Sequence, residues 1–273
     1  MSERLSKRRL EEIATTLGDR DKAVLSAIRH CRYLTTEHAR RLHFTDAANS
    51  SAGLRAANRN LHKLKEMGLT DTLDQRIGGV RAGSSSLVWQ MTRGGERLMR
   101  LIGKGAQFPM NPDEHSPFFL AHTLAIAECY VQFTELCRGK GLNLVRVELE
   151  PECWRPYSHK GKPETLKPDL FAVTHCDDYE DRWFIEVDLD TQAPVRVVDK
   201  CRRYHEYYRS GKEQAAHKML PLSVWIVPDA ARKESLTKHI RNEFKELPNI
   251  FIVITPDELE RLIRQGADRT ELC

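Results

Sequence analysis

The residues with the clearest capacity for chemistry are acidic side chains in the second half of the chain. Asp169 opens one expected strand, and Glu186 and Asp188 lie in the next one. Because side chains alternate between the two faces of a strand, Glu186, Asp188 and Asp190 should share one face. Stacked like charges are unfavourable without a counter-charge, so we expect a cation or basic side chains beside them.

Two of these carboxylates could share a hard divalent cation. If their strands are neighbours, Asp169 and Glu186 would bind Mg²⁺ or Mn²⁺, with Asp188 as an additional ligand. Such a cation would activate a water molecule and neutralise the charge that develops on a phosphodiester. The alternative interpretation is a solvent-facing strand that carries ordinary surface acids.

The length and the charge distribution suggest two domains. A chain of 273 residues exceeds the size of a typical single domain. Residues 1–110 contain 20 Lys and Arg against 11 Asp and Glu, whereas the remainder contains 23 against 28. This asymmetry favours a polyanion-binding module joined to a second domain.

Several classes of protein are disfavoured by composition and motifs. No apolar run approaches the length of a membrane span, mean hydropathy is −0.53, and the charged N-terminal segment lacks the apolar stretch of a signal peptide. We therefore expect a soluble, cytoplasmic protein without a membrane partner. The seven cysteines include no C-x-x-C pair, which argues against a disulfide scaffold or a structural zinc site. The sequence contains no P-loop, dinucleotide-binding glycine motif or G-x-S-x-G motif.

The first region reads as helices followed by a hairpin. Hydrophobic spacing predicts helices over 2–16, 19–32, 37–42, 50–67 and 95–102, extended pieces over 69–74 and 86–92, and a glycine-rich loop over 76–83. Three helices followed by a β-hairpin is the order of a winged helix-turn-helix, in which the third helix enters the major groove. We expect this domain, with an N-terminal helix, over residues 1–102, a linker over 103–117 and a second domain over 118–273.

The third helix of that unit, residues 50–67, has a polar face suited to DNA. Its expected buried stripe is Leu54, Ala57, Leu61 and Leu64, and its exposed face presents Arg55, Asn58, Arg59, His62 and Lys63. Arginine reads guanine or phosphate and asparagine can read adenine. Arg76 and Arg81 would lie on the wing. The alternative is a solvated helix face in a dimerisation module.

The second region reads as alternating helices and strands, which indicates a mixed α/β domain. The expected elements are a helix over 117–138, strands over 142–149, 168–174 and 183–189, a helix over 195–209, a strand over 222–227, a helix over 231–246, a strand over 250–254 and a helix over 256–265. The loop 157–167 carries Lys160, Lys162 and Lys167, which could contact DNA or simply be solvated.

Residues 120–228 resemble the PD-(D/E)xK nuclease superfamily, with Asp169 after a proline and Glu186 matching its pattern. The resemblance implies an αβββαβ core and a metal-dependent catalytic site. The lysine of the pattern would fall at position 188, which is Asp188 here, and in this superfamily it can come from the following helix. Lys200 is then the candidate; it shares a helical stripe with Arg196, Arg203 and Tyr207 that could instead bind phosphates.

Residues 20–230 also resemble the replication-relaxation family of plasmid and mobile-element proteins. The N-terminal part of the resemblance rests on Leu34-Thr35, Leu42-x-Phe44, Leu61-x-x-Leu64, Gly68-Leu69 and Val88-Trp-Gln-Met-Thr92-x-x-Gly95. The C-terminal part rests on His122, Asp169, Glu186-Val-Asp188, Lys200 and Tyr204. It implies a winged helix fused to a nuclease-like domain, in a protein associated with plasmid replication and relaxation of DNA.

Two hypotheses follow from these observations. The first is a double-stranded DNA-binding accessory or regulatory protein of a plasmid or mobile element, in which the nuclease-like domain is a scaffold. Its partners would be duplex DNA, a second copy of the chain, or replication or transfer proteins of the same element. The second is an active Mg²⁺-dependent endonuclease or nickase with Asp169, Glu186, Asp188 and Lys200 as its catalytic residues.

Overall fold

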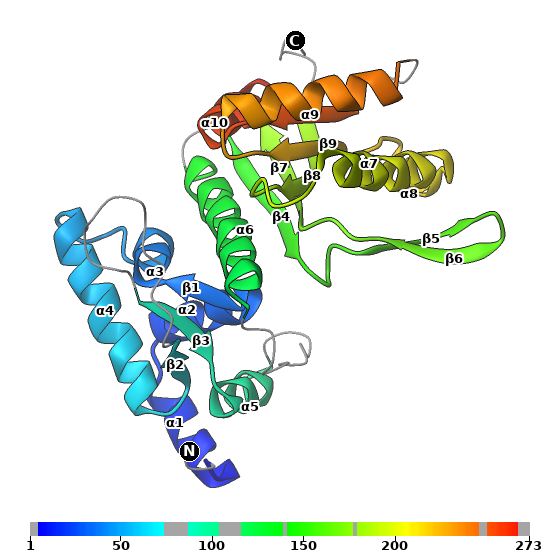
Figure 1. The fold of residues 1–273 in the computed structure, drawn as a ribbon. Helices are drawn as coiled ribbons and strands as arrows, with labels where there is room; N and C mark the ends of the chain where they lie inside the picture. Colours follow the sequence, from blue (N-terminus) through cyan, green and yellow to red (C-terminus); the bar gives the residue numbers. More distant parts are fainter. Residues whose placement is uncertain are drawn as a thin grey trace. The chain divides into compact units, whose positions relative to one another are not determined.

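The computed structural model describes residues 5–73, 87–103, 116–138, 141–176, 179–245 and 250–266. The chain is a mixed α/β protein, as the sequence predicts, and forms two compact units, Met1–Glu135 and Leu136–Cys273 (Figure 1). Most of the expected linker, residues 104–115, lies outside the described residues. Among the described residues, no helix is both long enough and apolar enough to cross a membrane.

The first unit combines helices with a small antiparallel sheet. Its strands lie in the order β1-β3-β2. The elements are α1 (Lys7–Thr16), α2 (Asp19–Cys31), β1 (Tyr33–Thr35), α3 (Thr36–His43), α4 (Ser50–Glu66), β2 (Thr70–Thr72), β3 (Val88–Met91), α5 (Arg93–Leu101) and α6 (Pro117–Leu136). The short strand β1 was not expected from the sequence, because three residues are too few to show an alternating pattern.

Local capping explains where α3 and α4 begin and end. The Thr35 hydroxyl accepts a hydrogen bond from the His38 backbone N–H at 3.1 Å, and the Asn49 side chain does the same for Ala52 at 2.9 Å. Gly68, with a φ of 73°, lies in the left-handed turn after α4. These caps explain where α3 and α4 begin and where α4 ends.

The buried stripe of α4 differs from the expected one at its first position. Ala57, Leu61 and Leu64 are buried as predicted, but Leu54 is exposed and Gly53 is buried instead. A Cβ on Gly53 would lie 3.1 Å from the carbonyl oxygen of Phe44. The first turn of α4 therefore approaches the end of α3 too closely for a large side chain, and this rotates Leu54 toward solvent.

Helix α6 packs with the first unit. Its Leu120 and Leu124 join a buried cluster with Tyr33 and Val88. From the sequence we expected this helix to open the second domain. In the structure, the helix belongs to the first compact unit as far as Glu135.

The second unit is built on a five-stranded mixed sheet in the order β10-β9-β8-β7-β4. Strands β4, β7 and β8 are antiparallel neighbours, and β8, β9 and β10 are parallel. The elements are β4 (Asn143–Leu149), β5 (Arg155–His159), β6 (Lys162–Leu166), β7 (Leu170–Cys176), β8 (Tyr179–Val187), α7 (Pro194–Arg209), α8 (Lys212–His217), β9 (Leu222–Ile226), α9 (Ala230–Glu243), β10 (Phe251–Ile254), a 3-10 turn (Pro256–Glu258) and α10 (Leu259–Gln265).

The segment expected to be a loop over 157–167 is mostly a separate two-stranded hairpin, β5–β6. Its inner residues Tyr157 and Leu166 are buried, whereas the outward positions are polar or proline. Frequent prolines and charges in this stretch hide the strand signal from the sequence pattern.

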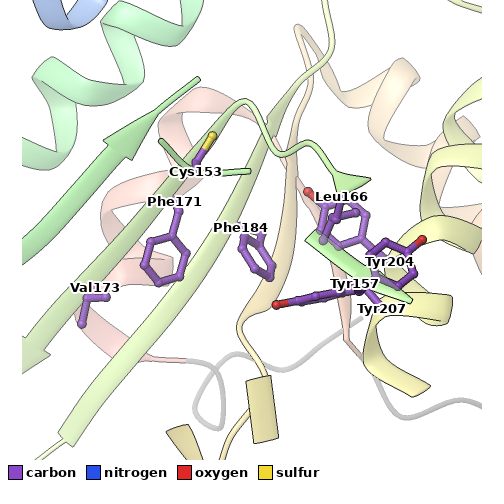
Figure 2. Close-up of a cluster of buried hydrophobic side chains, with 8 residues drawn as sticks. All are labelled: Cys153, Tyr157, Leu166, Phe171, Val173, Phe184, Tyr204 and Tyr207. Carbon is purple, nitrogen blue, oxygen red and sulfur yellow. The ribbon is translucent and has the colours of Figure 1, made fainter. Parts of the chain in front are cut away.

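Helix α7 covers one face of the sheet with aromatic residues. Figure 2 shows the rings of Phe171 and Phe184, from neighbouring strands, gathered with Tyr204 and Tyr207 of α7 and with Tyr157 of the hairpin. The Phe184 and Tyr204 ring centroids are 5.7 Å apart. This packing fixes α7 against the ends of β7 and β8, where the predicted acids lie.

Candidate functional site

The sheet register places Asp169 and Glu186 side by side. Leu170 pairs with Ile185 across β7 and β8, so the next position along each strand brings Asp169 opposite Glu186 on the same face. Both acids are buried, at 5% and 1% relative exposure. The alternative interpretation, a solvent-facing strand with ordinary surface acids, is therefore wrong.

One oxygen of each carboxylate is held by a protein donor. The backbone N–H of Val187 donates to Asp169 Oδ2 at 2.8 Å, and the Tyr204 hydroxyl donates to Glu186 Oε1 at 2.5 Å. The other oxygen of each acid lies near Lys200. The Lys200 ammonium lies 3.6 Å from Asp169 Oδ1 and forms an ion pair with Glu186 Oε2. The predicted Asp169, Glu186 and Lys200 are thus brought together.

Helix geometry explains why α7 supplies both contacts to Glu186. Lys200 and Tyr204 are one turn apart, so they project from the same side of the helix. Cys201, next to Lys200, is fully buried in the core between α7 and the sheet. Tyr207 was expected on one helical stripe with Lys200 that could bind phosphates, but it is buried and donates to Glu213 at 2.8 Å. That part of the predicted stripe is wrong.

Burial dominates the electrostatics of this cluster. Burial raises the pKa of Glu186 well above its usual range; the Asp169 carboxylate raises it further, and Lys200 acts in the opposite direction. Burial lowers the pKa of Lys200, but Glu186 and Asp169 outweigh it, so the net shift is upward. Burial and the nearby Glu186 raise the pKa of Tyr204, which keeps its hydroxyl a donor. A protonated Lys200 therefore faces two buried acids, and the raised pKa of Glu186 shows that its surroundings disfavour ionisation of this acid.

Asp188 has a different partner. Its carboxylate accepts from Arg232 Nε at 2.7 Å, and the same guanidinium contacts Asp190 at 2.9 Å and the Gln192 carbonyl at 2.7 Å. Asp188 follows the end of β8 instead of lying within the strand. In the described part of the chain, no group of three or more His, Cys, Asp or Glu side chains has metal-binding geometry. The predicted set of three acids is not assembled in this structure.

Glu150 is a neighbour of the site that the sequence did not single out. Leu149, the last residue of β4, pairs with Leu170 of β7, so Glu150 follows in the turn directly after β4, near Asp169, which directly precedes β7. Its charge contributes to the raised pKa of Lys200. A register shift in β4 between Leu144 and Arg146 sets this alignment, and no sequence pattern indicates it.

The predicted DNA-binding residues of α4 are all exposed. Arg55, Asn58 and Arg59 form no hydrogen bond or ion pair with any residue in the described ranges. Lys63 is paired with Asp21 of α2 at 2.6 Å, and the His62 ring lies edge-on to Trp89 at 5.1 Å. The predicted wing residues Arg76 and Arg81 lie outside the described residues.

Comparison with known proteins finds one family. The family model described as replication-relaxation matches residues 25–222, which is well over half of the sequence. The matched range includes the exposed face of α4 and the cluster of Asp169, Glu186 and Lys200. No curated protein and no solved structure matches.

Proposed function

Because the chain belongs to the replication-relaxation family, we propose that it is a double-stranded DNA-binding protein that acts in the replication or relaxation of a plasmid or mobile element. In this proposal the first unit recognises duplex DNA, and the second unit is a nuclease-like domain of the PD-(D/E)xK type.

The arrangement of the first unit supports the proposal. The element order α2-β1-α3-α4-β2-β3 and the sheet order β1-β3-β2 support our assignment of this unit as a winged helix-turn-helix domain. In such domains the helix at the position of α4 enters the major groove. The observation that carries the proposal is that Arg55, Asn58 and Arg59 are exposed along α4 and unpaired within the described residues.

The chemistry of these three side chains suits duplex DNA. Arginine can form bidentate hydrogen bonds with guanine or pair with phosphate. Asparagine can form bidentate hydrogen bonds with adenine. Lys63 is held by Asp21, so we assign it a supporting role at the phosphate backbone.

Fluorescence anisotropy of the full chain on a labelled duplex tests the proposal. Replacing Arg55 and Arg59 together by Ala should weaken binding at least ~10-fold and reduce the salt slope by about two. The matched control replaces the exposed Arg93 and Arg100 of α5, which removes the same charge from the same unit. Equal affinities for the two double variants across the salt series would contradict the proposal.

A second candidate function is a metal-dependent endonuclease, and one contact favours it. The Lys200 ammonium lies against one oxygen of Asp169 and one of Glu186, as a lysine from the following helix would in the PD-(D/E)xK pattern. Two carboxylate oxygens fit Mg²⁺ or Mn²⁺, because Mg²⁺ retains several waters and is bound through one or two carboxylates. When bound, such an ion would polarise water and a phosphate. Lys200 would then stabilise negative charge on the phosphate.

Supercoiled plasmid distinguishes the two candidates. An endonuclease should nick it with Mg²⁺ or Mn²⁺ but not with EDTA, and Lys200→Ala should slow nicking ~10²-fold. Lys238→Ala, an exposed lysine on α9, is the control. If the protein binds duplex DNA but shows no metal-dependent nicking, the endonuclease function is excluded and only the accessory function remains.

A further inference from the structure

Helix α7 presents basic residues on both sides of Lys200. Arg196, Lys200 and Arg203 follow one another at helical spacing, one turn apart, so they share one face. Arg196 and Arg203 are exposed, and neither forms an ion pair or hydrogen bond with any residue that the structure describes. The site at Asp169 and Glu186 is thus flanked along the helix by two unpaired guanidinium groups, roughly 10 Å apart at ~1.5 Å per residue.

The β5–β6 hairpin continues this basic surface beyond the Arg203 end of α7. The Tyr157 and Tyr207 rings pack edge to face at 5.4 Å, which attaches the hairpin to the C-terminal half of the helix. His159 of the hairpin lies 3.8 Å from Glu206 of α7. Figure 1 shows the hairpin projecting past the sheet beside α7 and α8.

The tip of the hairpin carries two further free charges. Lys160 and Gly161 form the turn, with φ values of 49° and 76°, and Lys162 opens β6. Both lysines are exposed, and within the described ranges neither has a charged or hydrogen-bonding partner. Pro156 and Pro163 lack backbone donors, which disfavours pairing with a strand from another protein. The exposed tip is suited to binding through its side-chain charge.

We infer that Arg196, Arg203, Lys160 and Lys162 form a basic track that binds the phosphate backbone of duplex DNA across the carboxylate site. The inference rests on the proposed function and adds a second contact surface, separate from α4. Because the hairpin extends only from the Arg203 end of α7, the track is asymmetric about the site.

The length of the hairpin limits how far from the carboxylate site its tip can contact DNA. Lys162 and Asp169 are seven residues apart along β6 and the segment that follows it. A fully extended chain at ~3.3 Å per residue would place the tip at most roughly 23 Å from the site. That distance corresponds to about seven base pairs at ~3.4 Å per nucleotide of each strand. The hairpin should therefore contact DNA to one side of the site, within about seven base pairs of it.

Anisotropy measurements on the full chain, with duplexes of increasing length and over a salt series, test the track. Two variants each remove two charges: Arg196→Ala with Arg203→Ala, and Lys160→Ala with Lys162→Ala. The control, Lys238→Ala with Arg241→Ala, removes two exposed charges from α9. Circular dichroism and thermal melting establish that all three variants fold.

Each track variant should reduce the salt slope by about 1.8 and weaken binding at least ~10-fold at about 0.1 M salt, while the control matches wild type. The arginine variant should weaken binding at every duplex length. The hairpin variant should also shorten, by up to about seven base pairs, the duplex that gives its maximal affinity.

The outcomes separate this inference from the proposed function. If the track variants match the control while loss of Arg55 and Arg59 abolishes binding, the track is wrong and the proposed function stands. If wild type shows no salt-dependent binding to duplex DNA, both are wrong. An unchanged length dependence in the hairpin variant overturns the contact at the tip.

Discussion

Arg41 in the first unit and Lys200 in the second unit each face two acids, and the two clusters differ in burial. In the first unit, Arg41 of α3 pairs with Glu128 at 2.7 Å and also with Glu135, both on α6. In the second unit, Lys200 faces Asp169 and Glu186. The Glu128 and Glu135 side chains are about one-third exposed, whereas the Glu186 side chain is 1% exposed.

The pKa values of the acids move in opposite directions. Burial raises the pKa of Glu128, but hydrogen bonds from His38 and Arg41 outweigh it, so the net shift is downward. Burial raises the pKa of Glu186, and Lys200 does not outweigh it. One basic side chain against two acids therefore produces a structural clamp of ionised groups in the first unit and, in the second unit, a buried cluster in which the ionised form of Glu186 is disfavoured.

The largest expected effect is on stability at the buried site. Lys200→Ala leaves two buried acids without their ammonium, so the free energy of unfolding of the second unit should fall by about 3 kcal/mol. Denaturant unfolding followed by tryptophan fluorescence measures it. Adding Glu186→Gln to Lys200→Ala should recover much of the loss. A double variant no more stable than Lys200→Ala would show that the two acids are not the cause.

The next largest expected effect is on the affinity of the second unit for a divalent metal ion. Asp169→Asn should weaken Mn²⁺ binding at least ~10-fold in calorimetry, because it removes one of the two carboxylates that face the same space. Glu234→Gln, an exposed acid on α9, is the control and should leave the affinity nearly unchanged. Equal heats for wild type and Asp169→Asn would exclude Asp169 as a ligand.

The clamp in the first unit should respond less to loss of its cation. Arg41→Ala should cost about 1 kcal/mol, because Glu128 and Glu135 can be rehydrated where they stand. Hydrogen exchange of the α3 and α6 backbone amides measures the local effect. A loss as large as that of Lys200→Ala would remove the distinction between the two clusters.

The smallest expected effects depend on pH and have opposite signs. The folded-state pKa of Glu128 is lowered, so its stabilisation is present above its unfolded pKa and is lost as pH falls through the folded value. The folded-state pKa of Glu186 is raised, so its ionisation destabilises the fold as pH rises above the unfolded value. Stability of wild type relative to Glu128→Gln and to Glu186→Gln, measured in EDTA from pH 3 to 8, should show these trends. Parallel trends would contradict the comparison.

Patterns of local origin were predictable from the sequence. Helical spacing and capping residues predicted α2 and α4 to within a residue or two, and α7 likewise. The juxtaposition of Asp169 and Glu186 followed from two consecutive apolar strands. Lys200 was named as the partner only through the resemblance to the PD-(D/E)xK superfamily, in which the lysine can come from the helix that follows the strand of Glu186.

Features that depend on tertiary contacts were not predictable. The pairing of Asp188 with Arg232 joins residues 44 positions apart, and nothing local indicates it. The proximity of Glu150 to Asp169 depends on a register shift in β4. Leu54 was assigned to the core because periodicity cannot show that Gly53 meets the Phe44 carbonyl.

The pairing of Asp188 with Arg232 has a consequence for how the family can diversify. Both side chains are buried. Replacing Arg232 alone would leave the Asp188 carboxylate without its guanidinium, and replacing Asp188 alone would leave Arg232 with only the exposed Asp190, so either change should destabilise the end of β8. A relative with lysine at position 188 should therefore lack arginine at position 232, and one with Asp188 should retain it. The two positions are expected to covary across relatives, so an ancestral exchange at 188 would have required a compensating change in α9.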